Sequence, residues 1–124
     1  MLFDSNIIIY SSQQQNRDLL RFVLSVTQRS VSIVSYIEAL GYHRLVERER
    51  QSLERFFQDA EILPLSDTIA RQAVALRQQR RMGLGDAIIA ATAMVHGLAL
   101  VTHNTEDFRW IANLELLDPL ENNP

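Results

Sequence analysis

The sequence contains no cysteine and no lysine, and all 12 of its basic residues are arginine. The absence of cysteine excludes disulfide bonds and thiolate metal ligands, and it fits the reducing cytoplasm in which we expect the protein to act. The absence of lysine excludes a Schiff base with a carbonyl substrate. It also excludes a phosphate-binding loop of the P-loop type, which needs a lysine.

Long apolar runs are missing as well. No stretch reaches the roughly 18 apolar residues that a membrane-spanning helix needs, so we expect no membrane partner. Residues 1–4 lack the basic and then apolar segments of a secretory signal, and we expect none. The chain has 124 residues, 47% of them hydrophobic, and a net charge of −3. We therefore expect a single domain over residues 1–124.

Segments with the pattern of strands alternate along the chain with segments that have helical spacing. Strands are predicted at residues 2–4, 31–34, 61–65, 98–102 and 114–117, with a turn at 7–10. Helices are predicted at 17–26, 35–45, around 53–57, 66–76 and 86–96. Predicted helix boundaries are N-caps at Ser35 and Ser66, a break at Gly83 and Gly85, and a left-handed stop at Gly97. This alternation predicts a parallel sheet with helices on both faces.

Four acidic residues stand where strands end or where the following helix begins. Asp4 ends the first strand, and Glu38 lies in the first turn of the helix after the second strand. Asp86 opens the most apolar helix, and Asp107 follows the strand at 98–102. In parallel sheets, ligands bind beyond the carboxyl ends of the strands. We therefore expect all four carboxylates at one edge of the sheet.

Carboxylates that share one edge repel one another. Each pair about 5 Å apart costs roughly 3 kcal/mol at an effective dielectric constant near 20. A divalent cation would offset this repulsion, and ligands with oxygen donors only select Mg²⁺ or Mn²⁺ over zinc. Such an ion can activate water and stabilise charge on a phosphate.

Each acid also has a purely structural alternative. Asp4 could form an Asx-turn, and Glu38 could complete a capping box with Ser35, three residues before it. Asp86 could cap its helix, and Asp107 could belong to an ordinary loop. The metal-site interpretation therefore depends on the four acids occurring together.

Three segments and one acid carry a recognisable pattern: Leu-Phe-Asp-Ser-Asn-Ile at 2–7, Glu38, Gly-Leu-Gly-Asp-Ala-Ile-Ile-Ala-Ala-Thr-Ala at 83–93, and Leu-Val-Thr-His-Asn-Thr-Glu-Asp-Phe at 100–108. Together they resemble PIN-domain toxins of the VapC type. The resemblance covers essentially the whole chain. It implies a three-layer α/β/α sandwich with a mainly parallel sheet, and a Mg²⁺- or Mn²⁺-dependent endoribonuclease that cleaves RNA. It further implies a homodimer and a cognate antitoxin encoded beside the toxin.

The resemblance also assigns the acids. Asp4, Glu38 and Asp86 match the core acids of the family. The fourth acid of the family stands either at the position of Asn104 or at that of Asp107. Asp107 is the only carboxylate of this pair, so we expect it to complete the catalytic and metal-binding set.

Further residues are candidates for contacts with substrate. They are Ser5, Asn6, Arg80, Arg81, Thr102 and Asn104. Ser5 stands where threonine is commoner in the family, and its hydroxyl can do the same orienting job. Arg80 and Arg81 precede the Gly83–Asp86 segment and could bind RNA phosphates, whereas a solvated helix face is the alternative for most other arginines. Trp110 is expected mainly in the core.

Rival classes differ in features that the sequence can be searched for. A signalling receiver domain has similar length and alternation, but it needs a lysine near the end of its sheet, and this chain has none. A non-catalytic PIN-like binding module would be expected to lose core acids, which are all present. A PIN-like nuclease that acts on structured DNA, or in RNA processing without a toxin role, is the remaining alternative.

Overall fold

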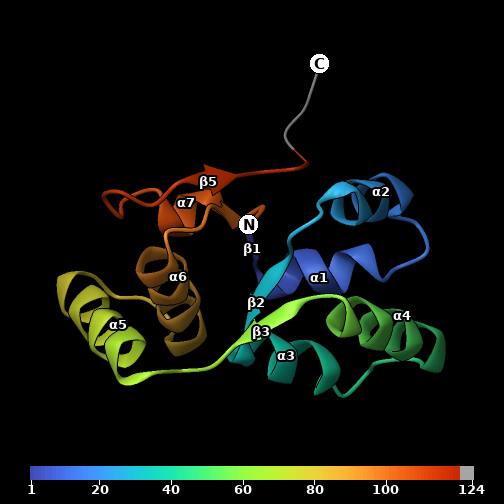
Figure 1. Cartoon of the computed structure of the whole chain (residues 1–124), viewed down its shortest axis with the longest axis horizontal. Helices are drawn as coiled ribbons and strands as arrows, with labels where there is room; N and C mark the ends of the chain where they lie inside the picture. Colours follow the sequence, from blue (N-terminus) through green and yellow to red (C-terminus); the bar gives the residue numbers. More distant parts are fainter. Residues whose placement is uncertain (121–124) are drawn as a thin grey trace.

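A parallel sheet of five strands runs through the centre of the computed structural model, which describes residues 1–120 (Figure 1). The strands are β1 (Leu2–Phe3), β2 (Ser30–Ser32), β3 (Glu61–Leu63), β4 (Leu100–Val101) and β5 (Leu116–Leu117). Their order is β3-β2-β1-β4-β5, and every pairing is parallel. From β1 the chain adds β2 and β3 on one side, and it then adds β4 and β5 on the other side of β1. The strand order therefore reverses between β1 and β4, and parallel sheets bind ligands at such a topological switch point.

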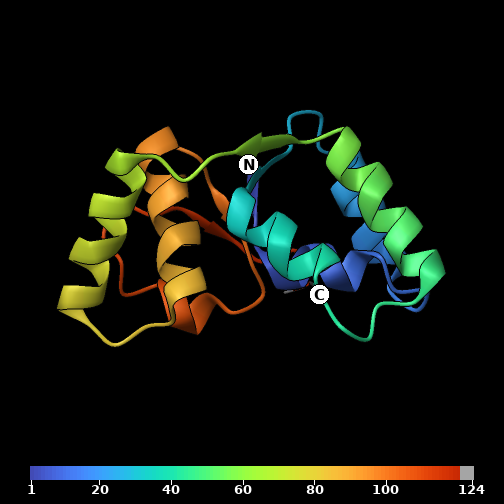
Figure 2. The ribbon, with the colours of Figure 1, turned by 90° about the horizontal axis from the view of Figure 1, so that it is seen from below.

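Seven helices in the described part of the chain surround the sheet. They are α1 (Ser5–Ser11), α2 (Arg17–Ser25), α3 (Ile33–Leu40), α4 (Glu47–Gln58), α5 (Asp67–Gln79), α6 (Leu84–His96) and α7 (Thr105–Phe108). Figure 2 shows α5 and α6 on one side of the molecule, α1, α2 and α4 on the other, and α3 between them. This is the three-layer α/β/α arrangement, and the prediction of the fold class is confirmed.

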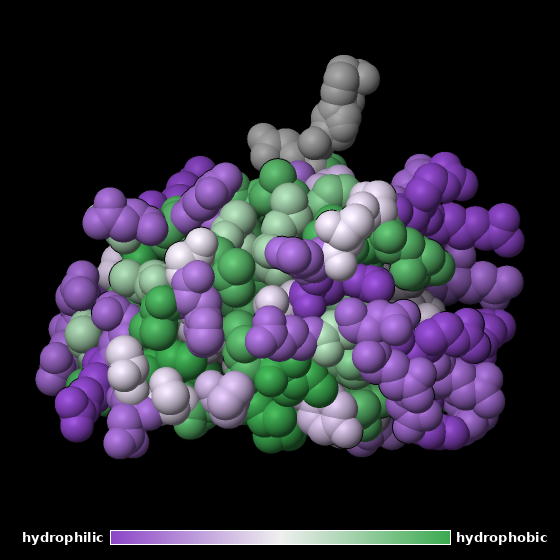
Figure 3. Space-filling model, in the orientation of Figure 1, coloured by the Kyte–Doolittle hydropathy of each residue, from purple (hydrophilic) through white to green (hydrophobic). Residues whose placement is uncertain are grey.

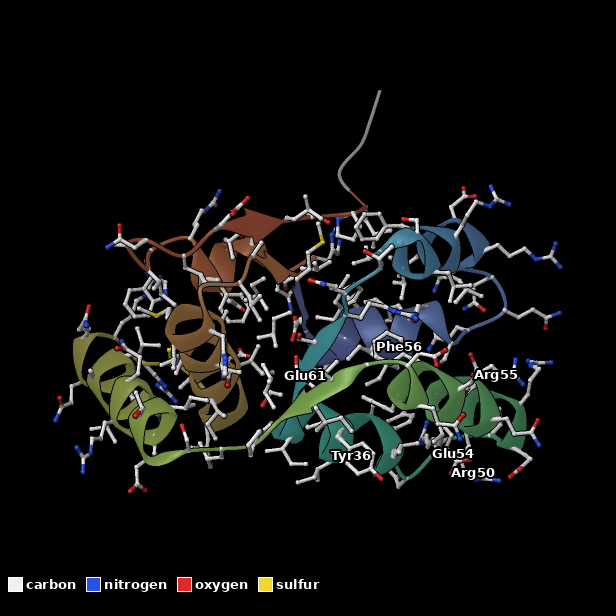
Figure 4. The ribbon with its side chains drawn as sticks, viewed as in Figure 1. Tyr36, Arg50, Glu54, Arg55, Phe56 and Glu61 are labelled. Carbon is white, nitrogen blue, oxygen red and sulfur yellow. The ribbon has the colours of Figure 1, made fainter. Side chains whose placement is uncertain are left out.

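The two faces of the sheet carry separate cores because neighbouring strand residues point to opposite sides. Leu2 and Leu100 pack with α5, α6 and α7, whereas Phe3 and Val101 pack with α1, α2 and α4. Helix α4 contributes Phe56 to the second core, and its outer face carries charged side chains such as Arg50 and Glu54, which form an ion pair (Figure 4). Hydrophilic side chains accordingly cover the α2–α4 end of the surface, whereas apolar ones gather over the middle (Figure 3).

Helix α6 is the most deeply buried helix, as its composition predicts. Its residues 87–93 are all buried, and four of these seven are alanines, which let the helix backbone approach the sheet closely. Gly97 ends the helix with φ 65°, in the left-handed region, and the Leu98 N–H donates to the Ala93 carbonyl at 2.9 Å. The predicted start was wrong by two residues, because α6 begins at Leu84 and includes Gly85.

The N-terminal segments differ more from the prediction. Residues 7–10 form most of α1 and not a turn, because Ile7 and Ile8 pack into the second core through one helix face. Strand β2 ends at Ser32, whose hydroxyl accepts from the Val34 N–H at 3.1 Å and caps α3. The predicted N-cap at Ser35 is therefore wrong, and α3 ends at Leu40 and not near residue 45.

Other boundaries agree more closely with the sequence pattern. Ser66 caps α5 as predicted, with its hydroxyl accepting from the Ile69 N–H at 3.2 Å. The strands at 61–65, 98–102 and 114–117 are each shorter than predicted, and α7 was not foreseen because four residues are too few to show a helical period. No helix within residues 1–120 is both long and apolar enough to cross a membrane.

Candidate active site

The four predicted acids lie at the carboxyl end of the sheet. Asp4 directly follows β1, Glu38 lies in the second turn of α3, Asp86 in the first turn of α6, and Asp107 in α7. The charges of Asp86 and Glu38 both act on Asp4, and those of Asp107 and Glu38 act on Asp86. The structure therefore brings all four carboxylates into one electrostatic group.

Asp4 is the most deeply placed of these acids, with a relative exposure of 4%. Its pKa is raised to about 6: burial is the largest cause and the charges of Asp86 and Glu38 add to it, whereas the hydroxyl of Thr102 and the backbone of Ser5 act to lower it. Its side chain makes no capping hydrogen bond to α1, so the Asx-turn alternative finds no support. Within residues 1–120 no arginine or histidine forms an ion pair with it, and its charge stays uncompensated.

Asp86 is half-buried, and its pKa is raised first by burial and then by the charges of Asp107 and Glu38. The N-cap of α6 is Gly83, so Asp86 does not cap this helix. Its position in the first turn nevertheless places it near the positive end of the helix dipole, which favours a carboxylate there. Asp86 is therefore held on a rigid element while one side of it stays open to solvent.

Glu38 is held by hydroxyl groups. The Ser5 Oγ lies 2.6 Å from Glu38 Oε1 and 2.9 Å from the Ser35 Oγ. Because an ionised carboxylate only accepts and a hydroxyl has one proton, Ser35 donates to Ser5 and Ser5 donates to Glu38. The capping-box alternative for Glu38 is wrong, because α3 begins before Ser35 and that serine is fully buried inside the helix.

Gly85 provides the space that Glu38 occupies. A Cβ at this position would lie 2.9 Å from Glu38 Oε2 and 3.7 Å from a methyl group of Val34. Any side chain at this position would therefore push against the carboxylate. The sequence pattern predicted that Gly85 breaks the helix. The local sequence could not show that Glu38, a residue of α3, packs against this glycine.

Thr102 and Asn104 extend the hydrogen bonding around Asp4. The Thr102 hydroxyl donates to Asp4 Oδ2 at 2.8 Å and accepts from the Asn104 N–H at 3.0 Å. Thr102 is fully buried, so its predicted contact with substrate does not fit the structure, and its geometry is that of a positioning residue. Asn104 is exposed at the start of α7, as is Asn6 on α1. Asn6 makes no side-chain hydrogen bond within the described residues, so the structure does not join it to the other candidates.

A small pocket adjoins the open side of the carboxylates. Its volume is about 180 Å³, and its lining includes Asp86, Asp107, Arg80, Arg81 and Trp110. Asp107 lines this pocket together with Asp86, whereas Asn104 does not, and the assignment of Asp107 as the fourth acid stays a prediction. Trp110 packs partly against the first core, so its predicted core position describes only part of the side chain.

The donor set suits a hard divalent cation. All candidate ligands are oxygens, the charges of neighbouring carboxylates raise the pKa of Asp4 and of Asp86, and no basic side chain within residues 1–120 forms an ion pair with any of the four acids. As placed, no three acidic or histidine side chains in this part of the chain converge closely enough to hold one ion. By their chemistry the residues nevertheless fit Mg²⁺ or Mn²⁺, and the exposed carboxylate of Asp107 would rotate to complete a site.

Comparisons with known proteins bear on the family. The PIN domain family matches residues 1–114 of this chain. Ribonuclease VapC10 of Mycobacterium tuberculosis is 35% identical over 91 residues, which cover 69% of this chain and 67% of that protein. A chain of a toxin–antitoxin complex from Klebsiella pneumoniae has a TM-score of 0.77 and 33% identity, and 98% of each chain is covered.

A more distant solved structure shows the same fold. It is the VapBC2 complex of Rickettsia felis bound to a DNA fragment from its promoter, in which one chain has a TM-score of 0.80 and 21% identity, with 94% of this chain and 96% of that chain covered. The family match includes all four acids and the pocket beside them. The chain therefore belongs to the PIN-domain family, and its resemblance to ribonucleases of the VapC type is confirmed.

Proposed function

We propose that this chain is the toxin of a type II toxin–antitoxin system, a Mg²⁺- or Mn²⁺-dependent endoribonuclease that cleaves RNA phosphodiester bonds in the cytoplasm. The observation that carries the proposal is the group of four uncompensated carboxylates at the switch point of a PIN-domain sheet. The relatives named VapC10 and VapC1 are ribonucleases, which supports RNA as the substrate class.

In this proposal Asp4, Asp86, Glu38 and Asp107 hold the metal ion. When bound, such an ion lowers the pKa of a coordinated water and stabilises charge on the phosphate. The protein contributes the placement of its ligands: Thr102 fixes Asp4 through a 2.8 Å hydrogen bond and Ser5 fixes Glu38 through a 2.6 Å one. Ligands held by such partners keep their orientation when the ion and the substrate arrive.

We further propose a cognate antitoxin as partner. The solved relatives from Klebsiella pneumoniae and Rickettsia felis are toxin–antitoxin complexes. An arginine of the antitoxin placed among Asp4, Asp86 and Asp107 would pair with carboxylates that lack a basic partner in the described chain, and it would exclude the cation. A structure of the complex with antitoxin bound only elsewhere, and the carboxylates left free, would contradict this mode of inhibition.

The predicted homodimer also stays a proposal. The groove along α5 and α6 has a volume of about 610 Å³, is lined largely by apolar side chains, and leaves Val74 and Leu84 more than half exposed. A second copy would cover this surface through a self-complementary, two-fold contact. Light scattering on the antitoxin-free protein should give the mass of a dimer, and Val74→Arg should shift it toward the monomer. An unchanged dimer in that variant would move the interface elsewhere.

The decisive test is cleavage by protein freed of antitoxin. RNA should be cut with Mg²⁺ or Mn²⁺, and cutting should stop with EDTA and return when the metal is restored. Structured DNA should be tested beside single-stranded RNA, because preferential cutting of DNA would favour the alternative nuclease class. Cutting of RNA that continues undiminished in EDTA would refute the metal mechanism, and no cutting with any added metal would favour the non-catalytic binding module.

A further inference from the structure

We propose that the pocket beside Asp86 and Asp107 is a nucleobase subsite, in which a base of the RNA next to the cleaved bond stacks on Arg80 and Trp110. This inference rests on the proposed ribonuclease function and adds the part of the substrate that binds there. The pocket measures about 180 Å³, which suits one flat group and not an extended segment.

Trp110 forms a rigid wall of this pocket. Its indole Nε1–H donates to the backbone carbonyl of Asp107 at 3.0 Å, and the ring is partly buried against the first core. The hydrogen bond ties the orientation of the ring to the residue that carries the fourth carboxylate. A base that contacts this wall is therefore held in a defined position relative to the acids.

Arg80 lies over Trp110. Its guanidinium carbon is 5.5 Å from the centre of the indole ring, within the range of a cation–π interaction. Unlike Arg50 and Arg109, which pair with glutamates, Arg80 forms no ion pair within residues 1–120. The planar guanidinium of an arginine stacks on bases as an aromatic ring does, and bases of single-stranded RNA use both kinds of surface.

The pocket is lined by two arginines and two carboxylates, so its charges do not select a phosphate, and without a metal the carboxylates favour an uncharged base beside them. Asp86 and Asp107 line the same cavity, and both would repel a phosphate that entered it without a metal. A base is uncharged and meets no such repulsion. Arg81, at the same pocket, is the side chain available to pair with the phosphate that connects this base to the rest of the strand.

The test uses the fact that Trp110 is the only tryptophan of the chain. A short single-stranded RNA is titrated into the unmodified protein in EDTA, where the proposed metal-dependent cleavage cannot occur, and tryptophan fluorescence is followed. Stacking should quench or shift the emission, and the same RNA with one abasic nucleotide beside the cut site should not. No change in emission while the RNA binds would overturn the subsite.

Variants provide a second measurement that does not depend on fluorescence. Trp110→Leu should weaken RNA binding on the order of tenfold, the usual effect of losing one base–aromatic stack, and Trp110→Phe should keep most of it. Arg80→Lys should also weaken binding, because the charge stays but the flat surface is lost. Tyr42→Leu, which removes an exposed aromatic ring outside the pocket, serves as the matched control.

The abasic RNA separates stacking from general weakening. With it, Trp110→Phe and the unmodified protein should bind equally, and the loss caused by Trp110→Leu should shrink to the level of the Tyr42→Leu control. Equal losses on intact and abasic RNA would refute the base contact. If the losses on intact and abasic RNA are equal while metal-dependent cutting persists, only the subsite is refuted and the proposed ribonuclease function stands. If the protein neither binds nor cuts RNA, the subsite and the proposed function are both refuted. Binding of an acidic peptide in place of RNA, with the same quenching, would assign the pocket to a protein partner and also overturn it.

Discussion

Asp4 and Asp107 belong to the same group of carboxylates, but their surroundings are opposite. Asp4 is 4% exposed and accepts a hydrogen bond from Thr102, whereas Asp107 is exposed on the short helix α7 beside an open pocket. Ser5 and Ser35 lie on the buried side as well, and their hydroxyls bond to each other. The site thus has two halves. We call the buried, hydrogen-bonded group of Asp4, Ser5 and Ser35 the inner half, and the exposed side that carries Asp107 and faces the pocket the outer half.

This difference predicts how substitutions will act. A change in the inner half alters packed, hydrogen-bonded groups, so it should affect both stability and activity. A change in the outer half alters exposed side chains whose contribution to stability is small, so it should affect activity alone.

Asp4 and Asp86 should both be needed for activity. Asp4→Asn in the inner half and Asp86→Asn between the halves should each lower metal-dependent RNA cleavage by about a thousandfold or more, because each removes charge that holds the metal ion. Expression without antitoxin should slow bacterial growth, and both variants should relieve this. Glu49→Gln, a partly exposed acid on α4, is the matched control and should stay toxic. If folded Asp4→Asn and Asp86→Asn proteins were as toxic as the parent, the site assignment would be wrong.

The second prediction separates stability from activity at Asp4. A pKa raised from 3.8 to about 6, chiefly by burial, corresponds to a cost of roughly 3 kcal/mol in the free energy of unfolding at neutral pH. The raised value belongs to the folded state, so the cost is full above pH 6 and disappears as the pH falls toward 3.8. Asp4→Asn keeps the shape and can still accept from Thr102, so it should stabilise the metal-free protein at pH 7.

Thermal melts would measure this effect. In EDTA the Asp4→Asn variant should melt higher than the parent at pH 7, and the difference should shrink toward pH 4. It should shrink also with saturating Mg²⁺, because the cation offsets the repulsion in the parent. A variant that melts clearly lower than the parent in EDTA would show that Asp4 is chiefly a structural residue.

The third prediction concerns the contact between α3 and α6. Replacing a helical glycine by alanine ordinarily stabilises a helix by about 1 kcal/mol. In Gly85→Ala the new Cβ would meet Glu38 Oε2 at 2.9 Å, and that carboxylate is the movable end of a side chain. We therefore expect melting to stay equal or rise while cleavage falls by about tenfold or more, as when a group that orients a metal ligand is lost.

Gly83→Ala is the matched control for this change, because a Cβ there would meet no atom within 4 Å. It should reduce cleavage far less than Gly85→Ala does. A Gly85→Ala protein with parental activity would show that Glu38 can act from a different position. A protein that loses stability would show that the backbone, and not the carboxylate, takes up the strain.

The features that the sequence predicted correctly are those that arise from interactions between residues close together in the chain. Gly97 and Ser66 act on backbone groups within a few residues, and both helix boundaries were predicted. The acids were found because the ends of parallel strands must share one edge. Ser35 and Gly85 were misread, because the first donates to Ser5, 30 positions away, and the second makes room for Glu38. Such long-range contacts have no local pattern.

Substitutions of Ser5 and Ser35, the two serines of the inner half, should have the smallest effects on cleavage. Ser5→Ala removes the only hydroxyl among residues 1–120 that donates to Glu38, and it leaves the buried Ser35 hydroxyl without its acceptor. We expect cleavage to fall about 10- to 100-fold and the Mg²⁺ concentration needed for half-maximal rate to rise. Ser5→Thr keeps the hydroxyl and should restore both.

Ser35→Ala acts one step further from the carboxylate. The Ser5 hydroxyl keeps its proton for Glu38 and loses only the hydrogen bond that it accepts, which is a smaller loss than an unpaired buried donor. The protein should lose about 1 kcal/mol in the free energy of unfolding, and cleavage should fall by less than about tenfold with the Mg²⁺ dependence nearly unchanged. Urea unfolding and Mg²⁺ titrations of both alanine variants would measure these values. If Ser35→Ala shifted the Mg²⁺ dependence as far as Ser5→Ala does, the two hydroxyls would act as one unit, and the order of donation inferred from their distances would be wrong.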